Sequence, residues 1–505
     1  MARDVVFIIP GIPGIPENVS GNAFPAPAID YASFIHAKCP SANVSFLDLD
    51  MEHQEHPVEN YSDLDVLKRV LKNHLDKNTV YPKVQGCIVI ACLTSYHYVS
   101  TVKISVALHE LVDEKAISKP LIVVGGYTTI EPQAFRGLGI DVILQGHGEI
   151  SLLEIIERGS AGEVTRTNPT LPAIAGKHMQ DLDELPPTCF ELYQPYLERY
   201  SHINISLSRG CPFGCVFCIE NRFSRINEPR SRWCAFSPSR AIQRIEAAVD
   251  VSETMLKNCD EKKIGFYDAI FGLDISWRKK VLQGLAGKRF GYEFKAETRV
   301  DTLNNAHLHM FHDAGFALTL GLESASPRML LLMNKTRNPV GYLMNLKKIM
   351  ETAKGIDFGP IYLNILLNFP GEDATSIEET YFFLDSIIKE GASFITNNRF
   401  YNMHPGDGIY RDLENWSRDL GTRVYYKDWW KDESTISLGT IIDPSRTLDF
   451  ASATSIYKEK TRHVHQACME NFKGYSEKML LLKRIAIEGA LMTKRAQYYR
   501  KYLST

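Results

Sequence analysis

Three cysteines crowd into eight positions near the middle of the chain, and their spacing is the feature best suited to chemistry. Cys211, Cys215 and Cys218 form a CxxxCxxC pattern with Pro and Gly between the cysteines. Such a loop can wrap around a cubane iron–sulfur cluster and supply thiolates to three of its four irons. No fourth cysteine follows at the spacing of a closed ferredoxin-like or zinc site, although Cys234 lies downstream. The spacing therefore predicts a cluster with one iron left open.

The elements that position this loop follow from alternating apolar runs and amphipathic stretches. In the first part of the chain, short apolar runs predict strands at 5–9, 44–47, 87–91, 121–124 and 142–144. Helical spacing of apolar residues appears between them, at 63–75 and 102–114. Strands that alternate with helices predict an α/β fold with a doubly wound parallel sheet. Sheets of this type bind ligands beyond the carboxyl ends of their strands.

Glycines and small hydroxyls follow four of these strands. Glycine lets the backbone approach a ligand closely, and hydroxyls offer small hydrogen-bonding groups. Ordinary turns of an α/β sheet explain any single loop, whereas four such loops at one edge indicate a binding site. The residues are those of the segment 10–16 after the first strand, Thr94 and Ser95 after the third, Gly125 and Gly126 after the fourth, and Gly146, His147, Gly148 and Glu149 after the fifth.

A second α/β alternation begins near residue 203, after a proline-rich stretch that we interpret as a linker. Strands are predicted at 203–207, 263–267, 294–297, 318–321 and 361–369, and helices at 240–249, 277–285, 305–312 and 340–354. This pattern predicts a full or partial (β/α) barrel. Beyond residue 407 the strands end, and 475–503 predicts one long helix with a basic, solvated face. We therefore expect domains at 1–165 and 197–405, a linker at 166–196 and a mainly helical C-terminal domain at 406–505.

Composition bounds the classes of function. The chain has 505 residues, 44% of them apolar, which is too long for one compact core. Its net charge of −3 provides no global positive field to draw it to nucleic acid or anionic lipid. No apolar run reaches the roughly 18 to 20 residues that cross a bilayer. Ten cysteines are too few for a disulfide scaffold. We expect a cytoplasmic protein without a membrane or nucleic-acid partner.

The cysteine loop resembles that of the radical S-adenosylmethionine (radical SAM) superfamily, whose hallmark is CxxxCxxC with an aromatic residue before the last cysteine. Phe217 is that residue here, and the resemblance implies that it lies near the adenine of SAM. In this superfamily the open iron of a [4Fe-4S] cluster chelates the amino and carboxylate groups of SAM. Reductive cleavage of SAM then yields methionine and a 5′-deoxyadenosyl radical, which abstracts hydrogen from substrate. An external electron donor of the flavodoxin or ferredoxin type is also implied.

Later strand ends carry further matches to this superfamily. The segments 297–301 and 321–326, the latter followed by 333–335, resemble its fourth and fifth strands, and 368–372 resembles its GxPGE turn. The resemblance makes Arg299 and Glu323 candidate contacts to the carboxylate, amine or ribose of SAM. An internal Arg–Glu ion pair is the alternative. Asp268 ends another strand, where it can contact SAM or cap the following helix.

The first domain resembles the Rossmann-like cobalamin-binding domain that precedes the barrel in one radical SAM subclass. Residues 123–126, 139–149 and 182–186 carry this resemblance, with His147 where an acid is usual. It implies that cobalamin contacts Thr94, Ser95, Gly125, Gly126, Gly146, Gly148 and Glu149. The DxHxxG motif that supplies a lower axial histidine is absent. We therefore expect base-off cobalamin without a histidine ligand.

A cobalamin-dependent radical SAM methyltransferase is the function that the resemblance implies. One SAM would methylate cobalamin, a second would generate the radical, and the methyl group would reach a carbon of a small-molecule or peptide substrate. No further catalytic residue is identified. Cyclisation or ring rearrangement without methyl transfer is the main alternative. A transfer-RNA methylthiotransferase needs a second cluster on three N-terminal cysteines, whereas Cys87 and Cys92 point to opposite faces of one strand. An iron–sulfur electron carrier would need no open iron.

Overall fold

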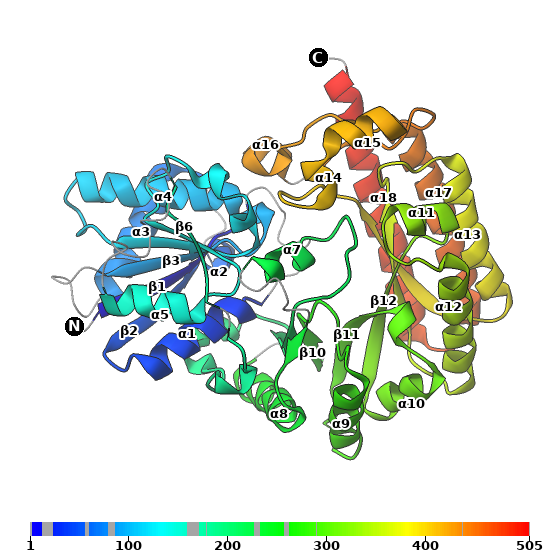
Figure 1. Cartoon of the computed structure of the whole chain (residues 1–505), viewed down its shortest axis with the longest axis horizontal. Helices are drawn as coiled ribbons and strands as arrows, with labels where there is room; N and C mark the ends of the chain where they lie inside the picture. Colours follow the sequence, from blue (N-terminus) through cyan, green and yellow to red (C-terminus); the bar gives the residue numbers. More distant parts are fainter. Residues whose placement is uncertain are drawn as a thin grey trace.

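The chain folds into two α/β lobes that lie side by side, the first blue to cyan and the second green to red in Figure 1. This computed structural model describes residues 3–12, 24–55, 60–78, 86–158, 171–177, 179–226, 233–256, 262–288, 290–436 and 438–503. Residues 13–16 of the first predicted loop, and most of the boundary that we expected near residue 165, lie outside these ranges.

The first lobe is built on a parallel six-stranded sheet in the order β2-β1-β3-β4-β5-β6. The order reverses between β1 and β3, and such a switch point opens a crevice at the carboxyl ends of the strands. The elements are β1 (Arg3–Ile9), α1 (Ala26–Lys38), β2 (Ala42–Asp48), α2 (Leu49–Glu55), α3 (Leu64–Asn78), β3 (Cys87–Ala91), α4 (Tyr98–Asp113), β4 (Leu121–Gly125), β5 (Val142–Gln145), α5 (Glu149–Arg158) and β6 (Ala173–Ala175).

Continuous apolar runs explain why these strands lie at the centre of the lobe. All five residues of β3 are buried, because helices cover both faces of a parallel sheet. Cys87 belongs to the core on one face, and Cys92, just beyond the strand, belongs to the core on the other. The prediction that these two thiols point to opposite faces is confirmed.

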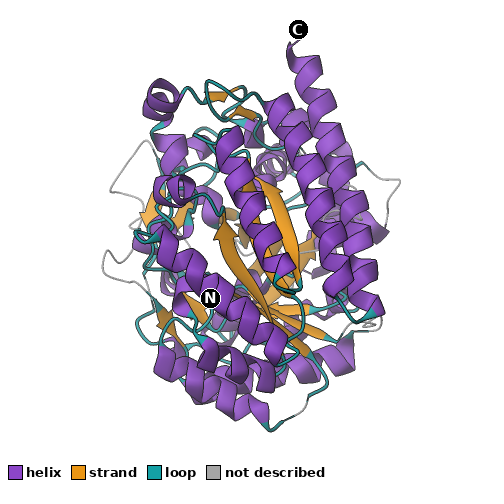
Figure 2. Cartoon of the chain, turned by 90° about the vertical axis from the view of Figure 1, so that its right-hand side faces the viewer, coloured by secondary structure: helices purple, strands orange, loops and turns teal. Residues whose placement is uncertain are grey.

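The second lobe contains a parallel six-stranded sheet in the order β7-β10-β11-β12-β13-β14, so the expected barrel is partial. Figure 2 shows this curved sheet with helices covering it. Its elements are β7 (Ile203–Ile205), β8 (Ser208–Arg209), α7 (Glu220–Arg225), β9 (Cys234–Ala235), α8 (Pro238–Met255), β10 (Lys263–Phe266), α9 (Ile275–Ala286), β11 (Glu293–Arg299), α10 (Asn305–Asp313), β12 (Phe316–Glu323), α11 (Pro327–Leu332), α12 (Pro339–Gly355), β13 (Ile361–Leu367), α13 (Ala374–Lys389) and β14 (Phe394–Phe400).

The stretch at 166–196 is more than the linker that its prolines predicted. Strand β6 pairs with β5 and completes the first sheet, and α6 (Gln194–Leu197) follows. Tyr193 packs edge-on against Phe24 and Phe46 of the first lobe. One apolar core consequently runs from the first sheet through this segment into the second sheet. Aromatic side chains of this segment pack between the two lobes and hold them together, and the proline content of the segment gives no sign of this packing.

The region beyond β14 is mainly helical, as expected, with one pair of two-residue antiparallel strands. Its elements are α14 (Gly408–Arg411), α15 (Leu413–Leu420), β15 (Arg423–Val424), α16 (Glu433–Ile436), β16 (Ile442–Asp443), α17 (Phe450–Asn471) and α18 (Tyr475–Leu503). Helix α17 packs on α13, and α18 lies along α17. Trp429 and Trp430 contact Tyr96 and Tyr98 of the first lobe, and Trp429 also donates to the Met403 carbonyl just beyond β14.

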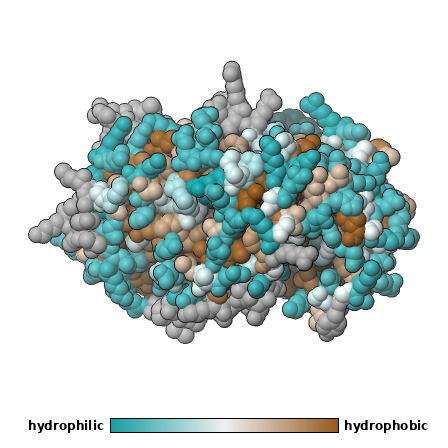
Figure 3. Space-filling view, turned by 90° about the horizontal axis from the view of Figure 1, so that it is seen from below, coloured by the Kyte–Doolittle hydropathy of each residue, from teal (hydrophilic) through white to brown (hydrophobic). Residues whose placement is uncertain are grey.

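The surface agrees with the nearly balanced charge of the sequence. Hydrophilic residues cover most of the face drawn in Figure 3, and apolar residues appear there in small separate patches. Among the described residues, no helix combines the length and the apolar character that a bilayer crossing requires.

Candidate active site

The cysteine loop follows β8 and is held by backbone contacts to the segment after α11. The Val216 amide donates to the Met333 carbonyl (3.1 Å), and the Asn334 side chain donates to the Gly214 carbonyl (2.7 Å). Asn334 has a φ of 50°, in the left-handed region. This backbone conformation, which a regular helix does not contain, turns the Asn334 side chain toward Gly214. The 333–335 segment, matched in the sequence without a known role, therefore forms the support of the cysteine loop.

The three cysteines of the loop carry free thiols that are available as ligands. None of Cys211, Cys215 and Cys218 forms a disulfide, and burial raises the pKa of the Cys211 thiol. Within the described ranges, no three His, Cys, Asp or Glu side chains converge at single-ion distances. A cluster that spans several atoms accepts thiolates at wider separations. Cys234 sits on β9 opposite Arg209, in the two-stranded ladder that precedes the loop. The donor set therefore fits a [4Fe-4S] cluster with three protein ligands.

Arg299 lies directly against the loop, at the end of β11. Its Nη1 donates to the Cys215 sulfur at 3.4 Å, and its guanidinium stacks 3.7 Å from the centre of the Phe213 ring. Asp301 accepts from its Nε and Nη2 at 2.8 and 2.7 Å, and the Lys335 carbonyl accepts a third bond. This arrangement fixes a positive charge beside one of the three cysteines. Arg299 can therefore stabilise the ligand set of the cluster.

The alternative for these two residues, an ion pair between Arg299 and Glu323, is not formed. Glu323 instead accepts from Lys335 at 2.9 Å, and both side chains are buried. Asp268, the third polar strand-end residue, accepts from the Leu207 amide at 3.0 Å and from the Ser208 hydroxyl. Burial raises the pKa of Asp268 to about 6. The helix-cap alternative for Asp268 is wrong, because Asp274 caps α9.

Phe217 and the GxPGE-like turn meet beside the cysteine loop. The Phe217 ring lies edge-on to Phe369, with 6.2 Å between centroids. Phe217 also lines a large cavity between the two lobes. Asn368 adopts a φ of 60° and donates its side-chain amide to the Ile442 carbonyl at 2.6 Å. An asparagine tolerates this left-handed conformation, which explains why it can stand where glycine is commoner.

Glu372 closes the same turn, and its buried carboxyl makes stability depend on pH. It accepts from the Tyr457 hydroxyl, and burial raises its pKa to about 7. The folded chain therefore binds a proton that the unfolded chain, with a glutamate pKa of about 4.3, has released. Stability should fall as pH rises through this window, by about 3 kcal/mol. Thermal unfolding at pH 5 and pH 8 should show that Glu372→Gln loses less stability between these pH values than the parent does.

The matched control for Glu372→Gln is Glu378→Gln. Glu378 is an exposed residue of α13 that pairs with Lys460. This variant should follow the parent at both pH values, because surface ion pairs contribute little. If Glu372→Gln lost as much stability between pH 5 and pH 8 as the parent does, the assignment of this pH dependence to Glu372 would be contradicted.

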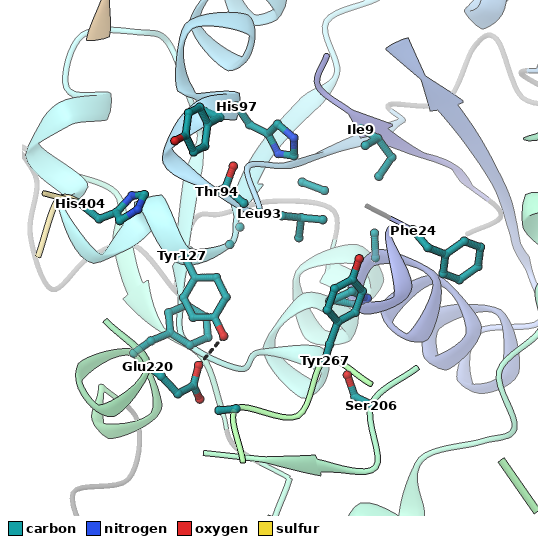
Figure 4. A pocket seen from close by; sticks show the side chains of 18 of the residues that line it. Ile9, Phe24, Leu93, Thr94, His97, Tyr127, Ser206, Glu220, Tyr267 and His404 are labelled. Carbon is teal, nitrogen blue, oxygen red and sulfur yellow. Dashed lines mark hydrogen bonds between the residues drawn. The ribbon is translucent and has the colours of Figure 1, made fainter. Parts of the chain in front are cut away.

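A cavity of about 970 Å³ lies where the carboxyl ends of the two sheets face each other. Figure 4 shows residues of both lobes around it, including Ile9, Thr94 and His97 from the first lobe and Ser206 and Tyr267 from the second. Its volume is at the upper end for small-molecule sites, which span about 300–1,000 Å³. The space is therefore large enough for a bulky cofactor together with part of a substrate.

Four of the seven predicted cobalamin contacts line this cavity: Thr94, Gly125, Gly126 and Gly146. Gly126 has a φ of 119°, and a Cβ there would collide with the Cys92 carbonyl. At Gly125 a Cβ would come no closer than 3.9 Å to the rest of the chain. Gly126 therefore lets the backbone after β4 pack closely on Cys92, and a cavity of this volume lined by strand-end glycines fits cobalamin.

The other three predicted contacts, Ser95, Gly148 and Glu149, support the cavity from behind. The Ser95 hydroxyl lies 2.6 Å from Nδ1 of His404, and the Gly148 amide donates to the Tyr31 hydroxyl at 2.7 Å. Glu149 is fully buried, with its carboxylate 2.5 Å from the Arg209 guanidinium. This pair joins the glycine-rich loop of the first lobe to the residue that precedes the cysteine loop.

Several cavity residues escaped the sequence interpretation. Tyr127 donates to Glu220, two residues after the last cysteine of the loop (Figure 4). The segment after β14 also contributes to the lining, through Phe400, Tyr401, Asn402 and His404. Arg399 and Arg495 also line it, from β14 and α18. Only the position of Glu220 beside the cysteines offered a signal in the sequence.

Curated relatives resemble parts of this chain. An uncharacterised methyltransferase of Pyrococcus horikoshii is 26% identical over 277 residues, which are 50% of this chain and 55% of the relative. The anaerobic magnesium-protoporphyrin IX monomethyl ester cyclase of Rubrivivax gelatinosus is 25% identical over 368 residues, 66% of this chain and 59% of the relative. The chain spans about half the length of the curated relatives it matches. No protein-family model matches it.

Solved structures match over nearly the whole chain. The cobalamin-dependent SAM radical enzyme OxsB, with aqua-cobalamin bound, superposes with a TM-score of 0.67 at 13% identity, covering 97% of this chain and 72% of that one. The radical SAM methyltransferase TsrM from Kitasatospora setae, with tryptophan substrate and a SAM analogue bound, gives 0.60 at 14% identity and 99% of both chains. The chain therefore has the fold of the cobalamin-dependent radical SAM enzymes.

Proposed function

We propose that this protein is a cobalamin-dependent radical SAM methyltransferase that adds a methyl group to a carbon of a small-molecule or peptide substrate. The observation that carries the proposal is the single cavity shared by the glycine-rich strand ends of the first lobe and by Phe217 of the cysteine loop. Methyl transfer to carbon after radical activation requires both cofactors to face one substrate. The methyltransferase name of the Pyrococcus horikoshii relative supports the same reading.

The cofactors supply the chemistry, and the chain positions them. When bound, the cluster delivers an electron that cleaves SAM, and cobalamin carries the methyl group to the substrate carbon. Cys211, Cys215 and Cys218 would hold the cluster, with Arg299 beside Cys215 as a compensating charge. Lys335 neutralises Glu323 within the same layer of strand ends. We assign Phe217 to the adenine of SAM and Arg299, Glu323 and Asp268 to the surroundings of its polar groups.

On the cobalamin side, we assign contacts to Thr94, Gly125, Gly126 and Gly146, and we propose that the cofactor binds base-off without a histidine ligand. His97 lines the cavity, and burial lowers its pKa to about 4, so it is a neutral histidine for which ligation to cobalt has to be tested. A nitrogen hyperfine pattern in the electron paramagnetic resonance (EPR) spectrum of bound cob(II)alamin would contradict this assignment. We further propose a flavodoxin- or ferredoxin-type electron donor.

Isotope labelling tests the methyl transfer without knowledge of the substrate. Protein reconstituted with cluster and cobalamin, incubated anaerobically with reductant and methyl-deuterated SAM, should yield cobalamin that carries the deuterated methyl group. Mass spectrometry of the extracted cobalamin detects it. Cobalamin that stays unlabelled while SAM is cleaved would favour the alternative, a cyclase or ring-rearranging enzyme, for which the similarity to the Rubrivivax gelatinosus cyclase is the specific support.

A transfer-RNA methylthiotransferase lacks such support. Its second cluster needs three cysteines together in the first lobe, whereas Cys87 and Cys92 lie in different cores on either face of the sheet. The electron-carrier alternative leaves the large cavity and its strand-end glycines without a purpose.

A further inference from the structure

We propose that the barrel end of the cavity recognises a carboxylate, or a similar oxyanion, on the substrate through Arg495 and Arg399. This inference names a substrate class and rests on the proposed function. Both side chains line the cavity, one from α18 in the C-terminal region and one from the last strand of the barrel.

Arg495 is a buried cation with unused donors. Its side chain is 5% exposed, and its Nη2 donates to Asn402 Oδ1 at 3.1 Å and to the Leu438 carbonyl. Its Nε and Nη1 have no hydrogen-bond partner among the described residues. The guanidinium lies 4.7 Å from the centre of the Phe400 ring. Burial lowers the pKa of Arg495 to about 10, so it remains charged at neutral pH.

The surroundings hold Arg495 in place. Gly439 has a φ of 68°, and a Cβ there would lie 2.6 Å from Nη2 of Arg495, so only glycine leaves room for the guanidinium. Asn402 also donates from Nδ2 to the Tyr96 hydroxyl at 2.7 Å. The Tyr96 hydroxyl then has its own proton available for a ligand. Asn402 and Gly439 thus fix the position of the Arg495 guanidinium, and the Tyr96 hydroxyl is a second donor beside it.

Arg399 adds a second positive charge on the same side. Its side chain is exposed at the cavity and forms no hydrogen bond or ion pair with the described residues. Arg399, Arg495 and Tyr96 line the same cavity, and both guanidinium groups lie within electrostatic range of the Tyr96 hydroxyl.

The acidic groups nearby leave this charge uncompensated. Glu297 on β11 lies within electrostatic range of Arg399 without reaching ion-pair distance. Glu488 on α18 is engaged by Arg484 at 3.6 Å and by Asn398 at 3.0 Å. Glu220 is bound by Tyr127 at the first-lobe side. Among the described residues, Arg495 therefore has no carboxylate at ion-pair distance, and Arg399 has Glu297 only at longer range.

A ligand anion is the simplest partner for such a site. A buried charge needs a counter-charge and full hydrogen bonding, and the planar guanidinium matches a carboxylate with two parallel bonds. The carboxylate of SAM and the phosphate of cobalamin offer the same chemistry. Neither of the elements that carry the two arginines, β14 and α18, contributes the cysteine loop or the strand-end glycines, so the substrate is the source we favour.

Two measurements test the site on cluster- and cobalamin-loaded protein. In calorimetric titrations with 1-naphthoate and its neutral amide, the carboxylate should bind at least about tenfold more tightly. Arg495→Met and Arg399→Met should each remove most of this preference, whereas the exposed neighbour Lys494→Met should keep it. Arg399 makes no internal bonds, so its variant should fold even if Arg495→Met does not. In crystals soaked in bromide, anomalous scattering should place bromide between the two guanidinium groups.

Each outcome decides the proposal. Equal binding of acid and amide, absence of acid binding, or bromide without any acid preference (an adventitious ion only) overturns it. Loss of SAM or hydroxocobalamin binding in Arg399→Met would assign the anion to a cofactor rather than to the substrate, which also overturns it. The failure of this site and the failure of the proposed function can be told apart. If the protein prefers the acid but does not cleave SAM, the anion site stands and the proposed function fails. If it cleaves SAM but shows no preference for the acid, the proposed function stands and the anion site fails.

Discussion

Replacing any one of Cys211, Cys215 and Cys218 by alanine should abolish SAM cleavage. Three thiolates hold three irons, so the loss of one exposes the cluster to solvent and to loss of iron. We expect formation of 5′-deoxyadenosine to fall by more than about 1,000-fold, because the uncatalysed cleavage is negligible. Anaerobic reconstitution followed by iron and sulfide analysis, with chromatography of 5′-deoxyadenosine, measures both effects.

Cys234→Ala is the matched control for these variants. Cys234 is a partly buried cysteine on the strand next to Arg209, close in sequence to the loop but outside it. Its replacement should leave iron content and cleavage at the level of the parent. Loss of iron in Cys234→Ala would identify a fourth protein ligand and would exclude the open iron.

The second large effect concerns the pair of Glu149 and Arg209. Glu149 is fully buried and the Arg209 side chain is only 12% exposed, so removal of one partner leaves the other charge largely buried and unpaired. Glu149→Gln should therefore destabilise the folded protein by about 3 kcal/mol. The double variant Glu149→Gln with Arg209→Met should recover part of this loss. Thermal and urea unfolding of the four proteins measure the coupling.

Glu154→Gln, on the same helix α5, serves as the control because its ion pair with Lys177 is on the surface. It should unfold like the parent. At temperatures where Glu149→Gln is folded, it should still bind hydroxocobalamin as the parent does. Cobalamin binding lost without any loss of stability would return Glu149 to the role of a cofactor contact, as the sequence predicted.

Features that depend on local sequence could be predicted, whereas features that depend on distant segments could not. The run Cys87–Ala91 predicts β3 to the residue, because a strand buried on both faces is apolar throughout. Strand β14 escaped notice because Thr396, Asn397 and Asn398 interrupt its apolar pattern. These residues face neighbouring polar groups, such as Asn364 and His465, that become partners only after folding.

The candidate site divides in the same way. The cysteine loop is contiguous, so its chemistry could be predicted from spacing alone. Arg495 reaches the cavity from α18, which follows the loop by more than 250 residues, and no pattern within the helix distinguishes it from the exposed Lys494 beside it. The motif around Glu149 was recognised in the sequence, but its ion pair with Arg209, 60 residues away in the chain, was not.

The EPR spectrum of the reduced cluster, recorded with and without SAM, tests the open iron most directly. SAM whose amino group carries nitrogen-15 should shift the spectrum and show coupling between that nitrogen and the cluster, because the amino group binds the iron that no cysteine holds. A spectrum that saturating SAM leaves unchanged would mean that the fourth iron is closed, and the protein would then be no radical SAM enzyme.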